Sequence, residues 1–259
     1  MAVYSSMKEI LEAFAAGAIS TEEAMNQLNA NRFEELGEMA RLDTGRTVRC
    51  GMPEAVLAEG KDPVHLLEIL CAMTRETGRC LATRLSRETY DELLGSLKGA
   101  GYATEYNAIA RTLIVHDGTP APKPKGGVVG FLTAGTADIS VAEEARVVAV
   151  EMGCETKVAY DVGAAGIHRL FPALQELQGA QVYVVAAGRE GTLPAVVAGL
   201  VDVPVIGVPV STGYGFMGQG EAALASMLQS CSVLTVVNID AGFIAGAFAA
   251  RIALMVGEK

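Results

Sequence analysis

The second half of the sequence alternates between strand-like and helix-like patterns, which constrains the fold more than any other feature. The candidate strands are short, mainly apolar segments: 128–132, 157–160, 182–186, 205–208 and 233–238. Helical spacing of apolar residues follows each of them, at 141–152, 166–177, 194–200, 218–228 and 241–255. Strands that are apolar on both faces are typical of parallel sheets covered by helices. The pattern therefore predicts an α/β domain with a three-layer, doubly wound parallel sheet.

The first half of the sequence predicts a smaller domain of different character. Residues 1–40 show helical apolar spacing, and residues 41–118 mix short strand and helix patterns into an α+β unit. The expected elements of that unit are strands at 47–50, 80–84, 103–106 and 113–115, and helices that begin at Asp62-Pro63 and span 89–97. Alternating prolines at 119–125 predict an extended linker. We expect domains at 1–118 and 126–259.

Composition excludes several classes of protein. The net charge of −10 disfavours binding to nucleic acid. There is no basic-then-apolar leader and no uninterrupted apolar run of about 18 residues, so the sequence predicts neither secretion nor a membrane span. Five cysteines without CxxC or Cys/His metal spacing argue against a disulfide framework or a zinc site and fit the reducing cytoplasm.

The first turn of the predicted sheet is a candidate ligand site. Small residues at 134–138 follow the strand at 128–132, and Ser140 with Glu143 has the spacing of a capping box that starts the next helix. A helix N-terminus after such a turn offers free N–H groups to a phosphate or carboxylate. A plain, well-capped turn is the alternative.

Four loops are expected to meet at the carboxyl ends of the strands, where ligands of such sheets bind. The loops cover 133–138, 161–168, 187–192 and 209–218 and are rich in glycine, which lets the backbone approach a ligand closely. Their candidate site residues are Gly135, Thr136, Ala137, Asp138, Asp161, His168, Gly188, Arg189, Glu190, Ser211 and Tyr214. We expect a small anionic ligand there.

Three of the candidate side chains also admit a simpler interpretation. His168 is a possible general base or a surface histidine early in a helix. Arg189 suits a phosphate or carboxylate, although a lone arginine is more often a surface residue. Cys231 precedes the last strand, at the amino end of the sheet, where a thiol alone would be inert and buried. The arginines of 41–118 likewise either hold an anion or form a solvated face.

Four motifs follow one another in the C-terminal half: AGTAD after the first predicted strand, GREGTLPAVV after the third, PVIGVPVS around the fourth and a final LQSCSVLTVVNIDAGFIAG. In this order the sequence resembles the PurE class, the aminoimidazole ribonucleotide carboxylases and mutases. Two loops depart from that class. The third carries Arg189-Glu190-Gly191-Thr192 in place of an Ala-His-Leu-Pro setting, and the second lacks Ser-Ala-His-Arg.

These departures match the LarB family, the pyridinium-3,5-biscarboxylic acid mononucleotide synthases of nickel-pincer cofactor biosynthesis. The similar segments are AGTADISVAEEA, DVGAAGIHRL, AAGREGTLPAVVAGLVDVPVIGVPVSTGYG, LQSC and VVNIDAGFIAG, with a looser match in RTVRCGMPE at 46–54. The resemblance implies a PurE-like, flavodoxin-like C-terminal domain. It also implies carboxylation of nicotinic acid adenine dinucleotide by CO2 or bicarbonate, hydrolysis of its phosphoanhydride, and release of AMP.

The resemblance further assigns roles to residues. Cys231 is the match for the family's cysteine that adds to the pyridinium ring, and Glu190, Asp138 and His168 are candidate bases in that order. Asn238, in the last motif, joins the candidate substrate ligands. Mg²⁺ is expected to assist hydrolysis, with no organic cofactor. Because Cys231 is expected at the opposite end of the sheet from the loops, we expect a homo-oligomer whose sites lie between subunits. The resemblance to the PurE class implies that this oligomer is an octamer.

Two alternatives stay open. One is a PurE-class carboxylase or mutase acting on aminoimidazole ribonucleotide. The other is a nucleotide-binding module without catalysis.

Overall fold

The computed structural model describes residues 6–37 and 40–257, and these divide into two compact units. The first unit contains the described residues up to Ala82, together with Glu88–Glu105 and Leu113–Thr119. The second contains Thr83–Arg87, Tyr106–Thr112 and the described residues from Pro120 onward. Two short segments of the first half of the sequence therefore pack with the second half. None of the described helices is long and apolar enough to cross a membrane.

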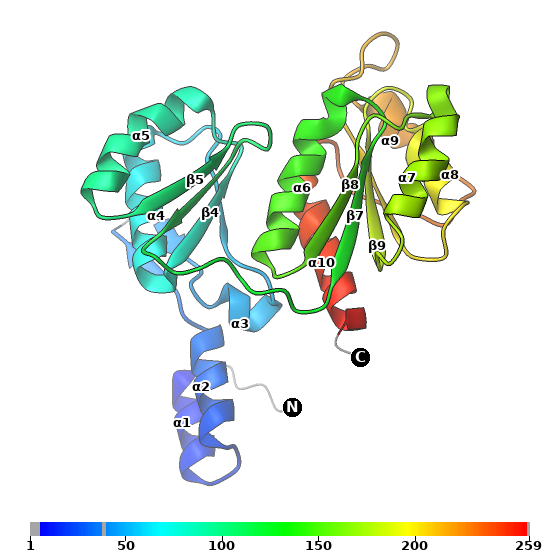
Figure 1. The fold of residues 1–259 in the computed structure, drawn as a ribbon. Coiled ribbons are helices and arrows are strands. Elements are labelled where there is room, and N and C mark those ends of the chain that lie inside the picture. The colour runs from blue at the N-terminus through cyan, green and yellow to red at the C-terminus, as the bar shows by residue number, and fades with distance from the viewer. Residues whose placement is uncertain (1–5, 38–39, 258–259) are drawn as a thin grey trace. The chain divides into compact units, whose positions relative to one another are not determined.

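The first unit begins with a helical hairpin and continues into a small mixed region (Figure 1). Its helices are α1 (Met7–Ala15), α2 (Thr21–Ala30), α3 (Arg46–Cys50), α4 (Pro63–Thr77) and α5 (Arg87–Gly99). Its strands are β1 (Glu34–Leu36), β2 (Ala40–Leu42), β3 (Ala55–Leu57), β4 (Arg79–Thr83), β5 (Ala103–Asn107) and β6 (Thr112–His116). β1 and β2 form an antiparallel pair, and the other four form a sheet in the order β3-β4-β6-β5.

Several expected elements of this unit are confirmed. Ser20 and Glu23 cap α2 reciprocally, and the Asp62 carboxylate accepts hydrogen bonds from the backbone of Val64 and His65 at the start of α4. Proline at the first position of α4 has no N–H to leave unpaired.

Two expectations for the first unit are wrong. The strand predicted at 47–50 is helix α3, which ends at Gly51 in the left-handed region with φ 70°. The side chain of Arg49 binds the carbonyl of Ala30 and the carboxylate of Asp43, and these contacts favour the helix over the β-branched preference of Thr47 and Val48. The helical pattern expected through residue 40 also breaks, because Glu34–Leu36 pairs with Ala40–Leu42. Residues 1–5 and 38–39 lie outside the described residues.

The second unit contains the predicted parallel sheet. Its strands are β7 (Val128–Thr133), β8 (Glu155–Ala159), β9 (Val182–Ala187), β10 (Val205–Pro209) and β11 (Thr235–Val236), in the order β11-β10-β9-β7-β8. All four pairings are parallel. The strand order reverses between β7 and β9, which is the switch point of this fold. β11 pairs over only two residues, shorter than the predicted 233–238.

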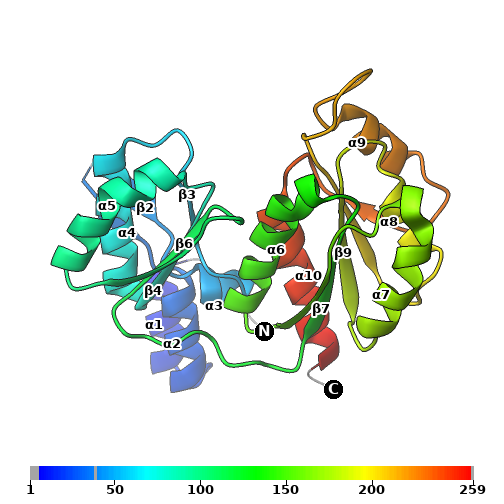
Figure 2. The ribbon, with the colours of Figure 1, turned by 45° about the horizontal axis from the view of Figure 1, so that its top comes forward.

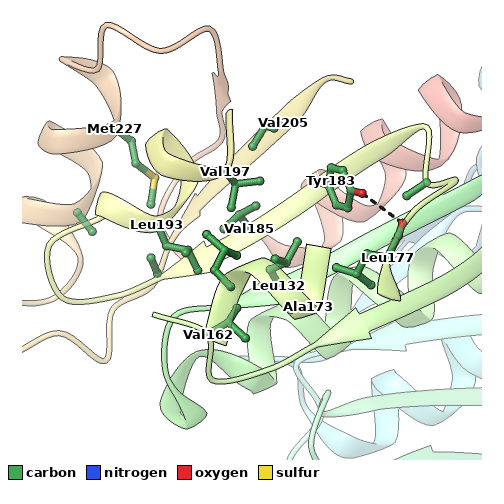
Figure 3. Packing of buried hydrophobic residues seen from close by; sticks show 14 residues of the cluster. Leu132, Val162, Ala173, Leu177, Tyr183, Val185, Leu193, Val197, Val205 and Met227 are labelled. Carbon is green, nitrogen blue, oxygen red and sulfur yellow. Dashed lines mark hydrogen bonds between the residues drawn. The ribbon is translucent and has the colours of Figure 1, made fainter. Parts of the chain in front are cut away.

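Helices cover both faces of this sheet (Figures 1 and 2). α6 (Ile139–Glu151) and α10 (Gly242–Gly257) pack against each other on one face. α7 (Leu170–Glu176), α8 (Thr192–Ala198) and α9 (Glu221–Leu228) cover the other. Their side chains meet those of the strands in one buried cluster (Figure 3), which includes Leu132, Leu177, Val185, Leu193 and Met227. Within it the Tyr183 hydroxyl donates to the carbonyl of Leu177, so its polar atom is satisfied. This core fixes the positions at which the strands end.

The helix after β7 does not begin as predicted. Instead of a capping box at Ser140, a 3₁₀ turn at Thr136–Asp138 leads into α6, and the Asp138 carboxylate accepts the N–H of Gly135. The Glu143 carboxylate does not form the predicted capping box with Ser140, because it binds Arg146 and Tyr160 instead. Asp138 accepts the N–H of Gly135, so the helical turn starts at Thr136, five residues before the predicted helix start at 141.

Candidate active site

A pocket of about 290 Å³ opens at the carboxyl ends of the parallel strands. It is formed by the ends of the four predicted loops, at 134–138, 163–165, 187–193 and 212–214. These loops follow β7, β8, β9 and β10, so the pocket lies at the switch point. Its location agrees with the general rule for open α/β sheets.

Asp138 lies in the floor of the pocket with only 5% of its surface exposed. Its Oδ2 accepts the N–H of Gly135 at 2.9 Å, and its Oδ1 accepts the hydroxyl of Thr212 at 3.3 Å. Burial raises the pKa of the Asp138 carboxyl, and hydrogen bonds from Gly135, Thr212 and the backbone of Gly188 oppose that rise. Asp138 is therefore a fixed acidic group joining three of the loops.

Gly188 permits this arrangement. A Cβ at this position would lie 2.8 Å from the Thr212 hydroxyl and 2.9 Å from Asp138 Oδ1. Any larger residue would push these two groups apart. The glycine lies behind the pocket wall and shapes it through its backbone.

Arg189 and Tyr214 form a pair at the pocket wall. The guanidinium carbon lies 4.5 Å from the centre of the tyrosine ring, and an Arg189 N–H donates to the Tyr214 hydroxyl. Both side chains are exposed, so the remaining guanidinium donors face solvent and can receive an anion. Glu190 is next to Arg189, also lines the pocket and is exposed. The pocket thus combines the buried carboxyl of Asp138 with two solvent-exposed charged groups, the carboxylate of Glu190 and the guanidinium of Arg189.

The structure places only part of the predicted site in this pocket. Six predicted residues line it: Gly135, Ala137, Asp138, Arg189, Glu190 and Tyr214. Seven do not line it: Thr136, Asp161, His168, Gly188, Ser211, Cys231 and Asn238.

Most of these seven have local structural contacts. Asp161 pairs with Arg169 at 2.7 Å, and the Asn238 side chain accepts the N–H of Ile239. His168 is exposed on a short 3₁₀ segment, Ala164–Arg169.

Cys231 is exposed between α9 and β11, at the amino end of the sheet. The expectation of a buried thiol is therefore wrong. The adjacent Ser232 hydroxyl binds the carbonyl of Ala195 on α8, which fixes this turn against the outer helices. Within one chain, Cys231 and the pocket residues belong to opposite ends of the sheet.

Thr212 is one of the pocket residues that sequence reasoning missed. Its neighbours Ser211 and Tyr214 were the predicted ligands, yet the Thr212 hydroxyl is the group that reaches Asp138. No signal in the sequence singles out Thr212, because the loop after β10 has no periodicity and Ser211 and Thr212 are both exposed.

Glu144 is a second buried acid of this unit, on α6. Its Oε2 accepts the N–H of Phe243 at the start of α10, and its Oε1 has no hydrogen-bond partner among the described residues. Burial raises the pKa of Glu144 to about 7, although the charges of Arg84 and Arg111 and the Phe243 N–H oppose this and Asp240 adds to it. The carboxyl is therefore mainly protonated below about pH 7.

We predict that Glu144 makes the folded state less stable as pH rises. The folded protein holds a proton at Glu144 between pH 4.5 and about 7 that the unfolded chain releases, so stability falls across this window. The full effect corresponds to roughly 3 kcal/mol. Glu144→Gln keeps an acceptor for Phe243 and does not titrate. Urea unfolding at pH 5 and pH 8 should show a smaller loss of stability for this variant than for the unmodified protein.

The neighbouring Glu143 provides the matched control. Burial raises its pKa, but hydrogen bonds from Arg146 and Tyr160 outweigh burial and leave the pKa below its usual value. The ionised Glu143 carboxylate therefore stabilises the folded state above pH 4.5, and this stabilisation is lost as the pH falls through its lowered pKa. Glu143→Gln should therefore reduce stability at pH 8. Equal pH dependence in the Glu144→Gln variant and the unmodified protein would contradict the assignment.

The fold and pocket together define a PurE-like α/β protein with a small-ligand site at the switch point, preceded by a small mixed α/β region. Comparison with known families agrees. The model described as AIR carboxylase matches residues 128–258, and the LarB/PurE-like N-terminal domain matches residues 33–117. An uncharacterized protein of Methanocaldococcus jannaschii is 44% identical over 254 residues, covering 96% of this chain and 97% of its own length.

The chain belongs to the AIR carboxylase family, a family of carboxylases, and carries a LarB/PurE-like N-terminal domain, which fits the LarB family. The predicted resemblance and the predicted fold are both confirmed.

Proposed function

We propose that this protein carboxylates the pyridinium ring of nicotinic acid adenine dinucleotide and hydrolyses its phosphoanhydride, releasing AMP and pyridinium-3,5-biscarboxylic acid mononucleotide. The product would serve nickel-pincer cofactor synthesis in the cytoplasm. One observation favours this reaction over that of the purine carboxylases. No histidine is among the described residues that line the pocket, and the loop where the purine carboxylases are expected to carry one supplies Arg189 and Glu190.

The pocket dimensions support a mononucleotide half as its occupant. About 290 Å³ is close to the lower limit of small-molecule sites. The nicotinate mononucleotide half would occupy it, with its carboxylate or phosphate at Arg189. The adenylate half would extend beyond the pocket, where water can reach the phosphoanhydride.

The proposed chemistry begins with a thiolate. The carbon para to the pyridinium nitrogen is electrophilic, and addition of the Cys231 thiolate forms a C–S bond and a neutral dihydropyridine. The neighbouring ring carbon, now enamine-like, forms a C–C bond to CO2. A base then removes the proton from that carbon, and the C–S bond breaks to return the thiolate and the aromatic ring. Glu190 is the candidate base because its carboxylate is open to the pocket.

Magnesium is proposed to enter with the dinucleotide. The described residues contain no cluster of three acidic, histidine or cysteine side chains able to hold a metal ion. Mg²⁺ commonly binds substrate phosphates, keeps several waters and needs few protein ligands. The ion would neutralise charge on the phosphoanhydride during hydrolysis.

The test is a product assay. The purified protein is incubated with nicotinic acid adenine dinucleotide, ¹³C-bicarbonate and MgCl2, and the products are followed by mass spectrometry. We expect AMP and a labelled biscarboxylic mononucleotide in equal amounts. A parallel incubation contains aminoimidazole ribonucleotide in place of the dinucleotide, and consumption of that nucleotide alone would establish the purine alternative. Tight binding of the dinucleotide without turnover would establish the binding-module alternative.

Arg189 should contribute mainly to substrate binding. Losing one charge-assisted contact costs roughly 1.5–3 kcal/mol, so Arg189→Ala should raise KM for the dinucleotide about tenfold or more. Steady-state AMP release measures this. Arg251→Ala on α10, which removes an exposed arginine outside the pocket, is the control and should leave KM unchanged. An unchanged KM in Arg189→Ala would exclude Arg189 as the anion ligand.

A further inference from the structure

The pocket loop that follows β10 is tied to the turn that follows β11. The amide of Ser211 donates to Asp240 Oδ1 at 2.9 Å, and the amide of Asp240 donates to the carbonyl of Pro209 at 2.9 Å. Asp240 therefore holds the chain on both sides of Val210, at the point where β10 ends. Thr212 and Tyr214, which form part of the pocket wall, follow immediately.

Asp240 is itself held from a distant part of the sequence. Its carbonyl accepts a hydrogen bond from the Arg84 guanidinium at 2.9 Å, across 156 positions of sequence. Arg84 belongs to the short segment Thr83–Arg87 that packs within the second unit. The turn after β11 is thus held by a side chain from a distant part of the same unit.

The backbone of Asp240 is unusual. Its φ is 54°, in the left-handed region that aspartate, asparagine and glycine tolerate better than other residues. From this backbone conformation the Asp240 side chain accepts the hydrogen bond from the Ser211 amide, so the hydrogen bond depends on the left-handed conformation of residue 240. This combination requires a residue with a short acceptor side chain at position 240.

We infer that Asp240 is a positioning residue of the active site. Through the Ser211 amide it sets the start of the 211–214 loop, and so the Thr212 hydroxyl against Asp138 and the Tyr214 ring against Arg189. It does so without lining the pocket itself. Arg84 supports Asp240 from behind. The consequence for substrate binding rests on the proposed function, whereas the loop-holding role does not.

Two variants separate the hydrogen bond from the backbone and the charge. Asp240→Asn keeps the left-handed conformation and an acceptor oxygen but removes the charge. Asp240→Gly keeps the conformation and removes the acceptor. Hydrogen exchange of the Ser211 amide should be like the unmodified protein in Asp240→Asn. It should accelerate roughly tenfold in Asp240→Gly, the value for loss of one hydrogen bond.

The second test of the proposal measures the steady-state kinetics of both variants in the full-length protein. Asp240→Gly should raise KM for nicotinic acid adenine dinucleotide about tenfold with kcat changed much less, and Asp240→Asn should restore the original KM. Unchanged Ser211 exchange in Asp240→Gly would overturn the proposal. So would an equal rise of KM in both variants, because charge rather than position would then matter. If the unmodified protein does not turn over the dinucleotide, the proposed function fails, and the exchange measurement alone still decides the role of Asp240.

Discussion

Replacing Cys231 by alanine is expected to abolish formation of the carboxylated mononucleotide, lowering kcat by roughly a thousandfold or more. The thiolate is the group that converts the electron-poor ring into a nucleophile, and no other step of the proposed mechanism replaces it. Product analysis by mass spectrometry measures the loss. Stability should change little, because Cys231 is exposed and its removal leaves no cavity.

A second cysteine, Cys50, provides the control for the Cys231→Ala variant. Cys50→Ala removes a half-buried thiol of the first unit and should leave turnover unchanged. Retained turnover in Cys231→Ala would show that the cysteine is not the nucleophile.

The position of Cys231 makes the subunit arrangement testable. If the pocket of one chain is completed by Cys231 of the partner subunit, Cys231→Ala and Glu190→Gln are each inactive alone. Mixed oligomers of the two variants then regain activity at about a quarter of their sites, because one chain supplies an intact pocket and the other an intact thiol. No recovery after co-refolding or co-expression would contradict a shared site. The proposed homo-oligomer, an octamer, can be measured by light scattering on the same samples.

The second large effect is expected at Gly246 in α10. A Cβ there would lie 2.2 Å from the carbonyl oxygen of Ala145 on α6 and 2.7 Å from its Cα. These are backbone atoms and cannot rotate away, so α6 and α10 would have to separate. Overpacking of this kind costs roughly 1–3 kcal/mol or more, which exceeds the gain of about 1 kcal/mol in helix propensity. Gly246→Ala should therefore lower the unfolding temperature of the second unit.

Gly95 in α5 provides the matched control. It is also a helical glycine, but a Cβ there would meet nothing within 4 Å. Gly95→Ala should stabilise the first unit by about 1 kcal/mol, since only propensity changes. Thermal unfolding followed by circular dichroism should thus show opposite shifts for the same substitution. A stabilising effect of Gly246→Ala would mean that α6 and α10 are not packed this closely.

The regular elements of the second unit were largely predictable. The three central strands, β7, β9 and β10, are apolar on both faces, and parallel order follows from the crossovers, so the sheet and its helices could be expected from pattern alone. Short windows in the first unit were less reliable. The four residues 47–50 have a β-branched preference, yet the contacts of Arg49 with Ala30 and Asp43 accompany a helix. A window of this length carries too little periodicity to outweigh tertiary contacts.

The sequence by itself determined the fold class, the family and the four loops that form the pocket, because these follow from repeated patterns and specific motifs. Only the tertiary structure decided which side chain of each loop enters the pocket. Loops have no periodicity, so nothing in the sequence distinguishes Thr212 from Ser211, or shows that Asp138 and Arg189 line the pocket while His168 does not. The contact between Arg84 and Asp240, and the burial of Glu144, likewise arise only when distant segments pack together.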